Sequence, residues 1–392
     1  MIAWKSPSQA AEATDKSKPD QRQGSLPSDI DRWEPWLAWP FDGGTHAKFL
    51  QTYGQSERVS PLDVHEGLDL AVPAGTRVYS PVDGRVAMLF INNTRRPHRG
   101  IVISTVHGDV EVMVKLMHLR KNTIQVNLGD RVSVGDYLGN VVQWPTDDPD
   151  DLYPSHLHLG LGIGHLDAKG KRKSVGGEDE LVLNPVDAYE ANANPLVHLR
   201  APIDEIPPVC VSLNPGGRPV EASFREHSTR MPDNPLVFRP LIGTPSEWKQ
   251  SADILDPLRL SGTVDIAFAL RDLHTFGVDY ALAPLTVRLT IHRSGESSEE
   301  ELVLERKLLM DGPLYASDEF AKRIYLEPKG SMAKDHSAFV FHLTSLNGRG
   351  AEDDPPRGWV TEPGDYVVRV FAGDLTFPDT LVAAQRVTAL SD

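Results

Sequence analysis

Two stretches of the chain alternate apolar and polar residues with a period of two, the pattern of β-strands that bury one face. In the first stretch the strand-like runs are short, and turn signals such as Gly75 and Asp83-Gly84 separate them. These runs lie at 67–72, 76–80, 84–90, 100–105, 109–119, 136–142 and 156–163. The pattern predicts an all-β, mostly antiparallel first domain.

A second β pattern occupies the C-terminal half, with runs at 263–272, 285–293, 337–346, 365–375 and 382–390. Apolar and polar residues alternate within each run and polar loops separate the runs, which is typical of a β-sandwich. We therefore expect an all-β protein, with an antiparallel sheet domain at 32–190 and a β-sandwich of unknown role at 220–392. The polar segment 1–31 is expected to be a flexible leader, and the Pro- and Asn-containing segment 191–219 a linker.

Composition excludes several classes of function. The chain has 392 residues and a formal net charge of −15, which argues against a nucleic-acid partner because phosphate binding relies on clustered Lys and Arg. Its apolar segments are short and interrupted, so no membrane span is expected, and the leader lacks the apolar centre of a secretory signal. The single cysteine, Cys210, leaves only histidine and carboxylate side chains to form a metal site.

Two histidine motifs stand out in the first domain. In SHLHLGL, His156 and His158 would share one face of a strand and could reach one small object together. His65 and Asp69 are four residues apart, and Gly67 between them allows a bend that brings imidazole and carboxylate together. Either motif alone also fits ordinary surface histidines that form hydrogen bonds.

Taken together, the motifs fit a hydrolytic zinc site. Such sites usually have three N or O protein ligands and keep one position for water, and His65, Asp69 and one histidine of the pair fit that set. The other histidine of the pair would then accept a proton from water. His118, which follows a strand-like run, is a further candidate, although alone it fits a core or edge histidine.

The motifs, in their order, resemble a known family. HEGLDLAVPAGTRVYSPVDGRV, MHL, LGDRVSVGDYLGNVV, SHLHLGL and NPVDAY are similar to LytM/lysostaphin-type zinc metallopeptidases over about residues 39–189. The resemblance implies that Zn²⁺ is bound by His65, Asp69 and His158, with His118 and His156 as the catalytic histidines that do not bind the metal. All five positions are filled, which argues against the metal-free members that activate other enzymes.

This resemblance implies a zinc endopeptidase that cleaves peptide bonds in peptidoglycan cross-links or stem peptides. Two alternatives stay open: a non-enzymatic regulator of a cell-wall amidase, and a secreted protease that acts on Gly-rich proteins. A peptidoglycan substrate implies a periplasmic or extracellular location. The segment before the histidine pair departs from the family because it is long and acidic, and 147–151 is expected to be a solvated loop. The sequence does not predict the oligomeric state.

Overall fold

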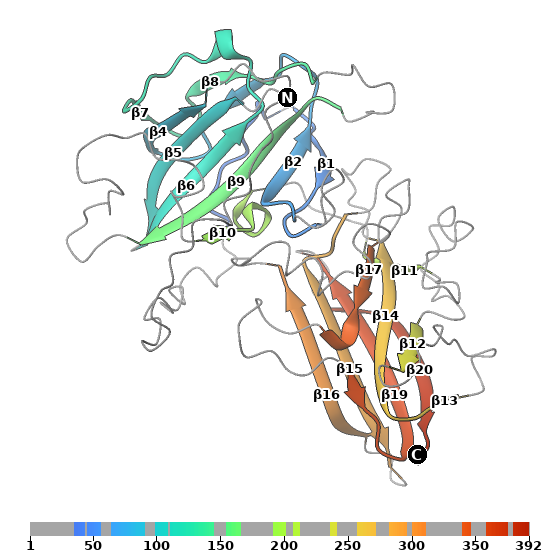
Figure 1. Cartoon of the computed structure of the whole chain (residues 1–392). Helices are drawn as coiled ribbons and strands as arrows, with labels where there is room; N and C mark the ends of the chain where they lie inside the picture. The colour runs from blue at the N-terminus through green and yellow to red at the C-terminus, as the bar shows by residue number, and fades with distance from the viewer. Residues whose placement is uncertain are drawn as a thin grey trace, which may run out of the picture. The chain divides into compact units, whose positions relative to one another are not determined.

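The computed structural model is almost entirely β, which confirms the predicted fold class (Figure 1). The structure describes residues 35–43, 45–55, 64–90, 99–108, 110–144, 154–165, 191–200, 207–211, 236–240, 257–271, 282–295, 300–310, 339–345, 358–374 and 379–391. The expected leader at 1–31 and the acidic segment at 147–151 lie outside these residues. Helical structure within them consists of short 3-10 turns.

The first domain is built on one eight-stranded antiparallel sheet, in the order β1-β2-β9-β6-β5-β4-β7, with β10 also paired to β9. These strands are β1 (Lys48–Gln51), β2 (Gly67–Ala71), β4 (Gly84–Phe90), β5 (Gly100–His107), β6 (Val110–Met117), β7 (Arg131–Val132), β9 (His156–His165) and β10 (Ala191–Ala193). Two further strands, β3 (Arg77–Tyr79) and β8 (Tyr137–Asn140), form a separate ribbon. Short 3-10 turns occur at Lys121–Thr123 (η1) and Pro195–His198 (η3).

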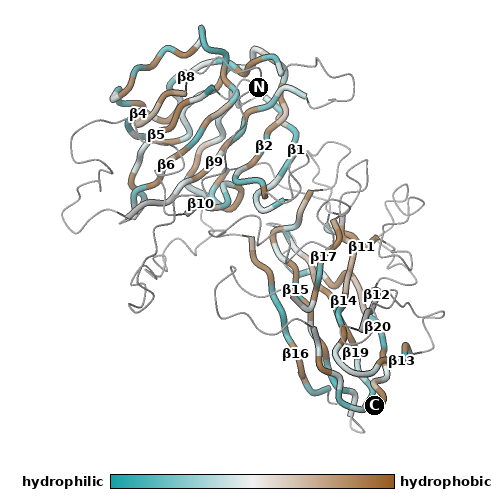
Figure 2. Tube along the Cα trace, viewed as in Figure 1, coloured by the Kyte–Doolittle hydropathy of each residue, from teal (hydrophilic) through white to brown (hydrophobic). Residues whose placement is uncertain are grey.

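The two faces of β9 differ in chemistry. Leu157, Leu159 and Leu161 are at most 1% exposed and share one face, because alternate residues of a strand point the same way. His156 and His158 therefore face the opposite side. Figure 2 shows hydrophobic residues along β4, β5 and β6 of the same sheet. The apolar face thus fixes which side of the sheet carries the histidines.

The second domain contains two five-stranded sheets, as expected for a β-sandwich. One sheet has the order β11-β14-β12, with β17 and β18 also paired to β14, and the other has the order β13-β20-β19-β15-β16. The strands are β11 (Val209–Val211), β12 (Leu236–Pro240), β13 (Leu258–Leu260), β14 (Thr263–Arg271), β15 (Thr286–Ser294), β16 (Glu300–Leu309), β17 (Phe339–His342), β18 (Trp359–Val360), β19 (Gly364–Gly373) and β20 (Thr380–Ala389), with a 3-10 turn, η5, at Leu343–Ser345. All pairs are antiparallel except β13 with β20.

Several short strands were not expected from the sequence. Among them, β1 and β7 have four and two residues, too few to show an alternating pattern. The segment expected as a linker, 191–219, contains β10, which pairs with β9, and β11, which pairs with β14. The proposed domain limits themselves stay predictions. Across the described ranges, the chain contains no helix with the length and hydrophobicity that a membrane crossing needs.

Candidate metal centre

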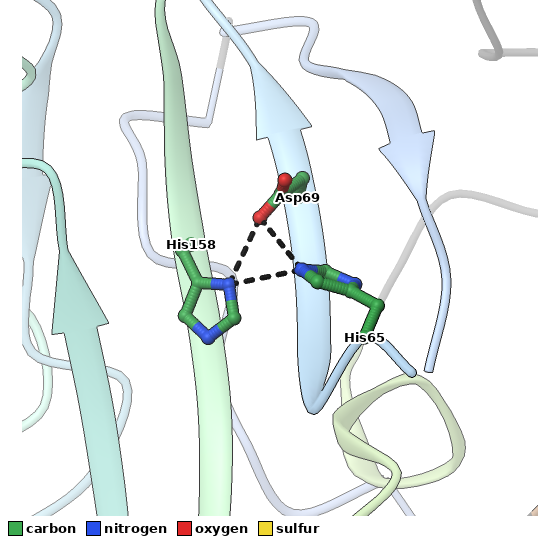
Figure 3. A group of neighbouring side chains, drawn as sticks. All are labelled: His65, Asp69 and His158. Carbon is green, nitrogen blue, oxygen red and sulfur yellow. Dashed lines mark hydrogen bonds and ion pairs between the residues drawn. The ribbon is translucent and has the colours of Figure 1, made fainter. Parts of the chain in front are cut away.

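The pairing of β2 with β9 brings together residues that are far apart in the sequence. Asp69 on β2 lies directly opposite His158 on β9, so their side chains share one face of the sheet. His65 lies just before β2, where its backbone N–H donates to the Gln55 carbonyl oxygen. From that position its ring points back toward Asp69 (Figure 3).

Three ligand atoms meet at this point. Asp69 Oδ1 lies 3.1 Å from His65 Nε2 and 3.0 Å from His158 Nδ1, and the two nitrogens are 3.1 Å apart (Figure 3). His65 and Asp69 are buried, and the His158 side chain is 18% exposed. Within the part of the chain that the structure describes, this is the single group of three His, Cys, Asp or Glu side chains close enough to hold a metal ion.

Hydrogen bonds around the group favour a cation. His65 Nδ1 lies 3.3 Å from the Thr52 carbonyl oxygen, which can only accept, so in the neutral ring the proton is on Nδ1. His65 Nε2 then presents a lone pair to the Asp69 carboxylate, an arrangement that repels unless a cation lies between them. In a tetrahedral zinc site with bonds of about 2.0–2.1 Å, ligand atoms are roughly 3.3 Å apart, close to the observed separations. The donor set and its spacing therefore fit zinc.

The electrostatics of the group agree with this fit. Burial raises the pKa of Asp69, but the electrostatic effect of the neighbouring His65, His156 and His158 outweighs it and holds that pKa well below its ordinary value. Burial lowers the pKa of His158 to about 4, against the opposing effect of Asp69. An ionised carboxylate and a neutral imidazole are the forms in which these side chains bind metals.

The two other predicted histidines lie beside the three-residue group. His156 Nδ1 donates to the Pro154 carbonyl oxygen at 2.8 Å, so in the neutral ring Nε2 carries the lone pair, and it lies 3.6 Å from Asp69 Oδ2. The centroid of the His118 ring is 4.6 Å from that of His156 and 6.1 Å from that of His158. The structure thus brings all five predicted residues together, and their individual roles stay predictions.

His118 has an unusual backbone. Its φ of 67° makes it the one non-glycine residue with positive φ among the residues described, a conformation that side chains rarely adopt. The adjoining segment fixes this bend, because the Val142 N–H donates to the His118 carbonyl oxygen and Leu119 bridges to Val141. The bend ends β6 and places the His118 ring against His156, a placement that the alternating pattern of 109–119 did not predict.

Trp144 was missed by the sequence analysis. Its ring centroid lies 4.6 Å from those of both His118 and His156, and the residue is 7% exposed. Its backbone N–H donates to Ser155 Oγ, which links it to the start of the His156 strand. An isolated Trp at the start of an acidic segment carries no signal in the sequence that would assign it to the site.

The segment that contains these residues matches known proteins in sequence. The sequence model of Peptidase family M23 matches residues 63–169, which contain all five residues. A segment of 84 residues is 37% identical to Peptidoglycan DD-endopeptidase ShyA from Vibrio cholerae, and covers 21% of this chain and 17% of that protein.

Solved structures with a similar chain include the catalytic domain of lysostaphin from Staphylococcus simulans. It is 21% identical, with a TM-score of 0.24, over 30% of this chain and 80% of that one. A zinc containing peptidase from Vibrio cholerae is 23% identical, with a TM-score of 0.25, over 33% of this chain and 37% of that one. Residues 63–169 of this chain, which contain all five candidate site residues, are thus similar in sequence to Peptidase family M23.

Proposed function

We propose that this protein is a zinc-dependent endopeptidase that hydrolyses peptide bonds in bacterial peptidoglycan. The observation that supports it most is the buried group of His65, Asp69 and His158, with two further histidines beside it. A protein that only bound and regulated another enzyme would not need the two additional histidines next to the metal ligands. The relative named a peptidoglycan DD-endopeptidase makes a bond between two D-amino acids the first to test.

Each residue has a task in this proposal. His65, Asp69 and His158 would hold zinc, which when bound acts as a Lewis acid that polarises the scissile carbonyl and lowers the pKa of water. The sheet holds the ligand atoms in place, since Asp69 and His158 are fixed by strand pairing and the Thr52 carbonyl orients His65. Such fixed orientation of ligands strengthens metal binding and catalysis.

The other two histidines would move protons. His156 keeps one proton on Nδ1 through its bond to the Pro154 carbonyl, so Nε2 is the atom that accepts a proton from the attacking water. That nitrogen lies 3.6 Å from Asp69 Oδ2, so it faces the group formed by His65, Asp69 and His158. His118, in ring contact with His156, would stabilise the negative charge that develops on the carbonyl oxygen and help the amine to leave protonated. Peptidoglycan as substrate implies action in the periplasm or outside the cell.

The test is digestion of purified peptidoglycan with the zinc-loaded full chain, followed by mass analysis of the soluble products. We expect fragments with one new amino terminus for each bond cleaved, no such fragments after chelation of the metal, and their formation at a rate roughly 10²–10⁴-fold lower with His156→Ala. Products that still form after chelation would contradict the metal mechanism. If no products form with the protein alone but appear when a cell-wall amidase is added, the protein is a regulator and the proposal is wrong.

A further inference from the structure

A tight turn at residues 52–55 lies against the ring of His65. The Thr52 carbonyl oxygen is 3.3 Å from His65 Nδ1, and the same oxygen accepts from the Gln55 N–H at 3.3 Å. A carbonyl oxygen has two lone pairs, so it can accept both bonds. Gly54 has a φ of 77°, a conformation that glycine adopts without a steric penalty. The orientation of the His65 ring therefore depends on how well this turn is fixed.

Backbone hydrogen bonds join the turn to the segment that carries His65. The His65 N–H donates to the Gln55 carbonyl oxygen at 2.7 Å, and the Gly54 N–H donates to the His65 carbonyl oxygen at 2.8 Å. These two bonds fix the backbone of His65 but not its ring, which can still turn about the side-chain bonds. The contact with the Thr52 carbonyl acts on the ring itself.

The Gln55 side chain folds back onto the turn. Its Oε1 accepts from the Thr52 N–H at 3.2 Å and from the N–H of Ala283, just before β15, at 3.4 Å. Because both donors are backbone N–H groups, the amide atom that faces them is the oxygen. Gln55 is 2% exposed and Thr52 is 5% exposed, so water does not readily replace these bonds. Loss of the amide oxygen would leave two buried donors without this acceptor.

The Thr52 hydroxyl adds a further bond to the same turn. Thr52 Oγ1 lies 3.1 Å from the Ala283 carbonyl oxygen and 3.4 Å from Gln55 Oε1, and both of these oxygens can accept its proton. Thr52 is thus held through its N–H and its hydroxyl, while its carbonyl oxygen contacts the His65 ring. The amide of Gln55 is the group that the other contacts of Thr52 have in common.

We propose that Gln55 is a positioning residue for the metal ligand His65. Gln55 fixes Thr52, and the Thr52 carbonyl keeps the proton on His65 Nδ1 and so directs the lone pair of Nε2 toward the metal position. In this role Gln55 touches neither metal nor substrate. Groups that orient a metal-binding histidine through its other ring nitrogen typically contribute about 10- to 100-fold to metal affinity.

This inference rests on the proposed function because it takes His65 as a zinc ligand, but zinc binding by the full chain tests it without any assay of activity. The probe is zinc alone, and its Kd is measured by competition with a chromophoric chelator. Gln55→Met keeps the length of the side chain without the amide oxygen, and should raise the zinc Kd about 10- to 100-fold. Gln55→Glu keeps an acceptor oxygen at the same reach and should bind zinc at least as tightly as the wild type.

A second pair of variants decides the matter if Gln55→Met does not fold. Thr52→Val removes the hydroxyl and keeps the size of the side chain, so it should raise the zinc Kd about two- to tenfold, the value of one neutral hydrogen bond. Thr52→Ser restores the hydroxyl and should restore the wild-type Kd.

The matched control is Ser80→Ala, which separates positioning from a general loss of stability. Ser80 is 1% exposed and its Oγ donates to the Val82 carbonyl oxygen at 2.6 Å, so its loss also removes a buried hydrogen bond. It should lower the unfolding midpoint and leave the zinc Kd unchanged. Unfolding is measured with and without zinc, because a ligand stabilises the folded state according to its Kd. The stabilisation by zinc should be smaller in Gln55→Met and unchanged in Ser80→Ala.

Each outcome is decisive. An unchanged zinc Kd in folded Gln55→Met or in Thr52→Val would overturn the positioning role, as would an equal rise in Ser80→Ala. Weaker zinc binding by Gln55→Glu than by Gln55→Met would overturn it too. The expected changes in Kd together with a wild-type chain that does not cleave peptidoglycan would support the positioning role and contradict the proposed function. A wild-type chain that does not bind zinc would contradict both.

Discussion

Removing the Trp144 ring tests whether the two non-ligand histidines need a fixed packing partner. The Trp144 ring contacts both His118 and His156 at centroid distances of 4.6 Å. Pairs of aromatic rings contribute about 0.5–1.5 kcal/mol each beyond their buried area, so the two contacts together are worth about 1–3 kcal/mol. If that energy holds the histidines in their productive positions, Trp144→Ala should lower kcat about 5- to 150-fold, since each 1.36 kcal/mol corresponds to a factor of ten.

The assay follows kcat, KM and zinc content on soluble peptidoglycan fragments. Because the ring contacts His118 and His156, which we propose transfer protons, kcat should fall while zinc stays near one per chain and KM changes little. Trp144→Phe keeps a ring and should restore most of kcat. A buried Trp→Ala change also costs about 3–5 kcal/mol of stability, so the measurement is made well below the melting temperature of the variant.

The matched control is Trp39→Ala. Trp39 belongs to the same domain and packs edge-on against Phe41, with its indole N–H donating to the Thr45 carbonyl oxygen. Its loss should lower stability and leave kcat unchanged. The reasoning is refuted if Trp144→Ala keeps wild-type kcat with full zinc, or if both variants lose kcat equally.

Two further predictions follow from other residues. Gly67→Ala should lower zinc content and destabilise the fold by about 1–3 kcal/mol, because the new Cβ would lie 2.6 Å from both the His158 ring and the Leu159 carbonyl oxygen. Gly43→Ala is the control, because a Cβ there meets open space and should change neither quantity. Intact zinc binding in Gly67→Ala would contradict this prediction. Burial and the charge of His107 lower the pKa of His198 to about 4, against 6.5 unfolded, so the unfolded chain binds more protons between these values. The free energy of unfolding measured with urea should therefore fall by about 3 kcal/mol as the pH is lowered from above 6.5 to 4. His198→Gln should not show this loss. Parallel curves of unfolding free energy against pH for the two proteins would contradict the prediction.

The sequence predicted the local parts of the site well. The period of two in SHLHLGL is enough to place His156 and His158 on one face, since the leucines that alternate with them enter the core. The convergence of the His65 imidazole and the Asp69 carboxylate was also expected, although Gly67 proves to be the first residue of β2, where its missing Cβ leaves room for the His158 ring. Both are properties of neighbouring residues.

Other features depend on contacts that no local pattern encodes. The pairing of Asp69 with His158 joins strands that are distant along the chain, and from the residues alone either histidine of the pair could have been the ligand. The positive φ of His118 and the placement of Trp144 depend on the backbone bonds of Val142 and Trp144 to neighbouring segments. For the same reason the short strand β10, which owes its conformation to pairing with β9, was taken as part of a linker.

Zinc analysis and peptidase assay on the same preparations of His158→Ala and His156→Ala distinguish a metal-binding histidine from a proton-transferring one. We expect His156→Ala to keep about one zinc per chain and to lose turnover by roughly 10²–10⁴-fold, the usual contribution of a positioned acid or base. His158→Ala should lose metal and activity together, because we propose that His158 is one of three side chains that bind the metal. Zinc lost from His156→Ala and retained by His158→Ala, or full activity in His156→Ala, would contradict the account.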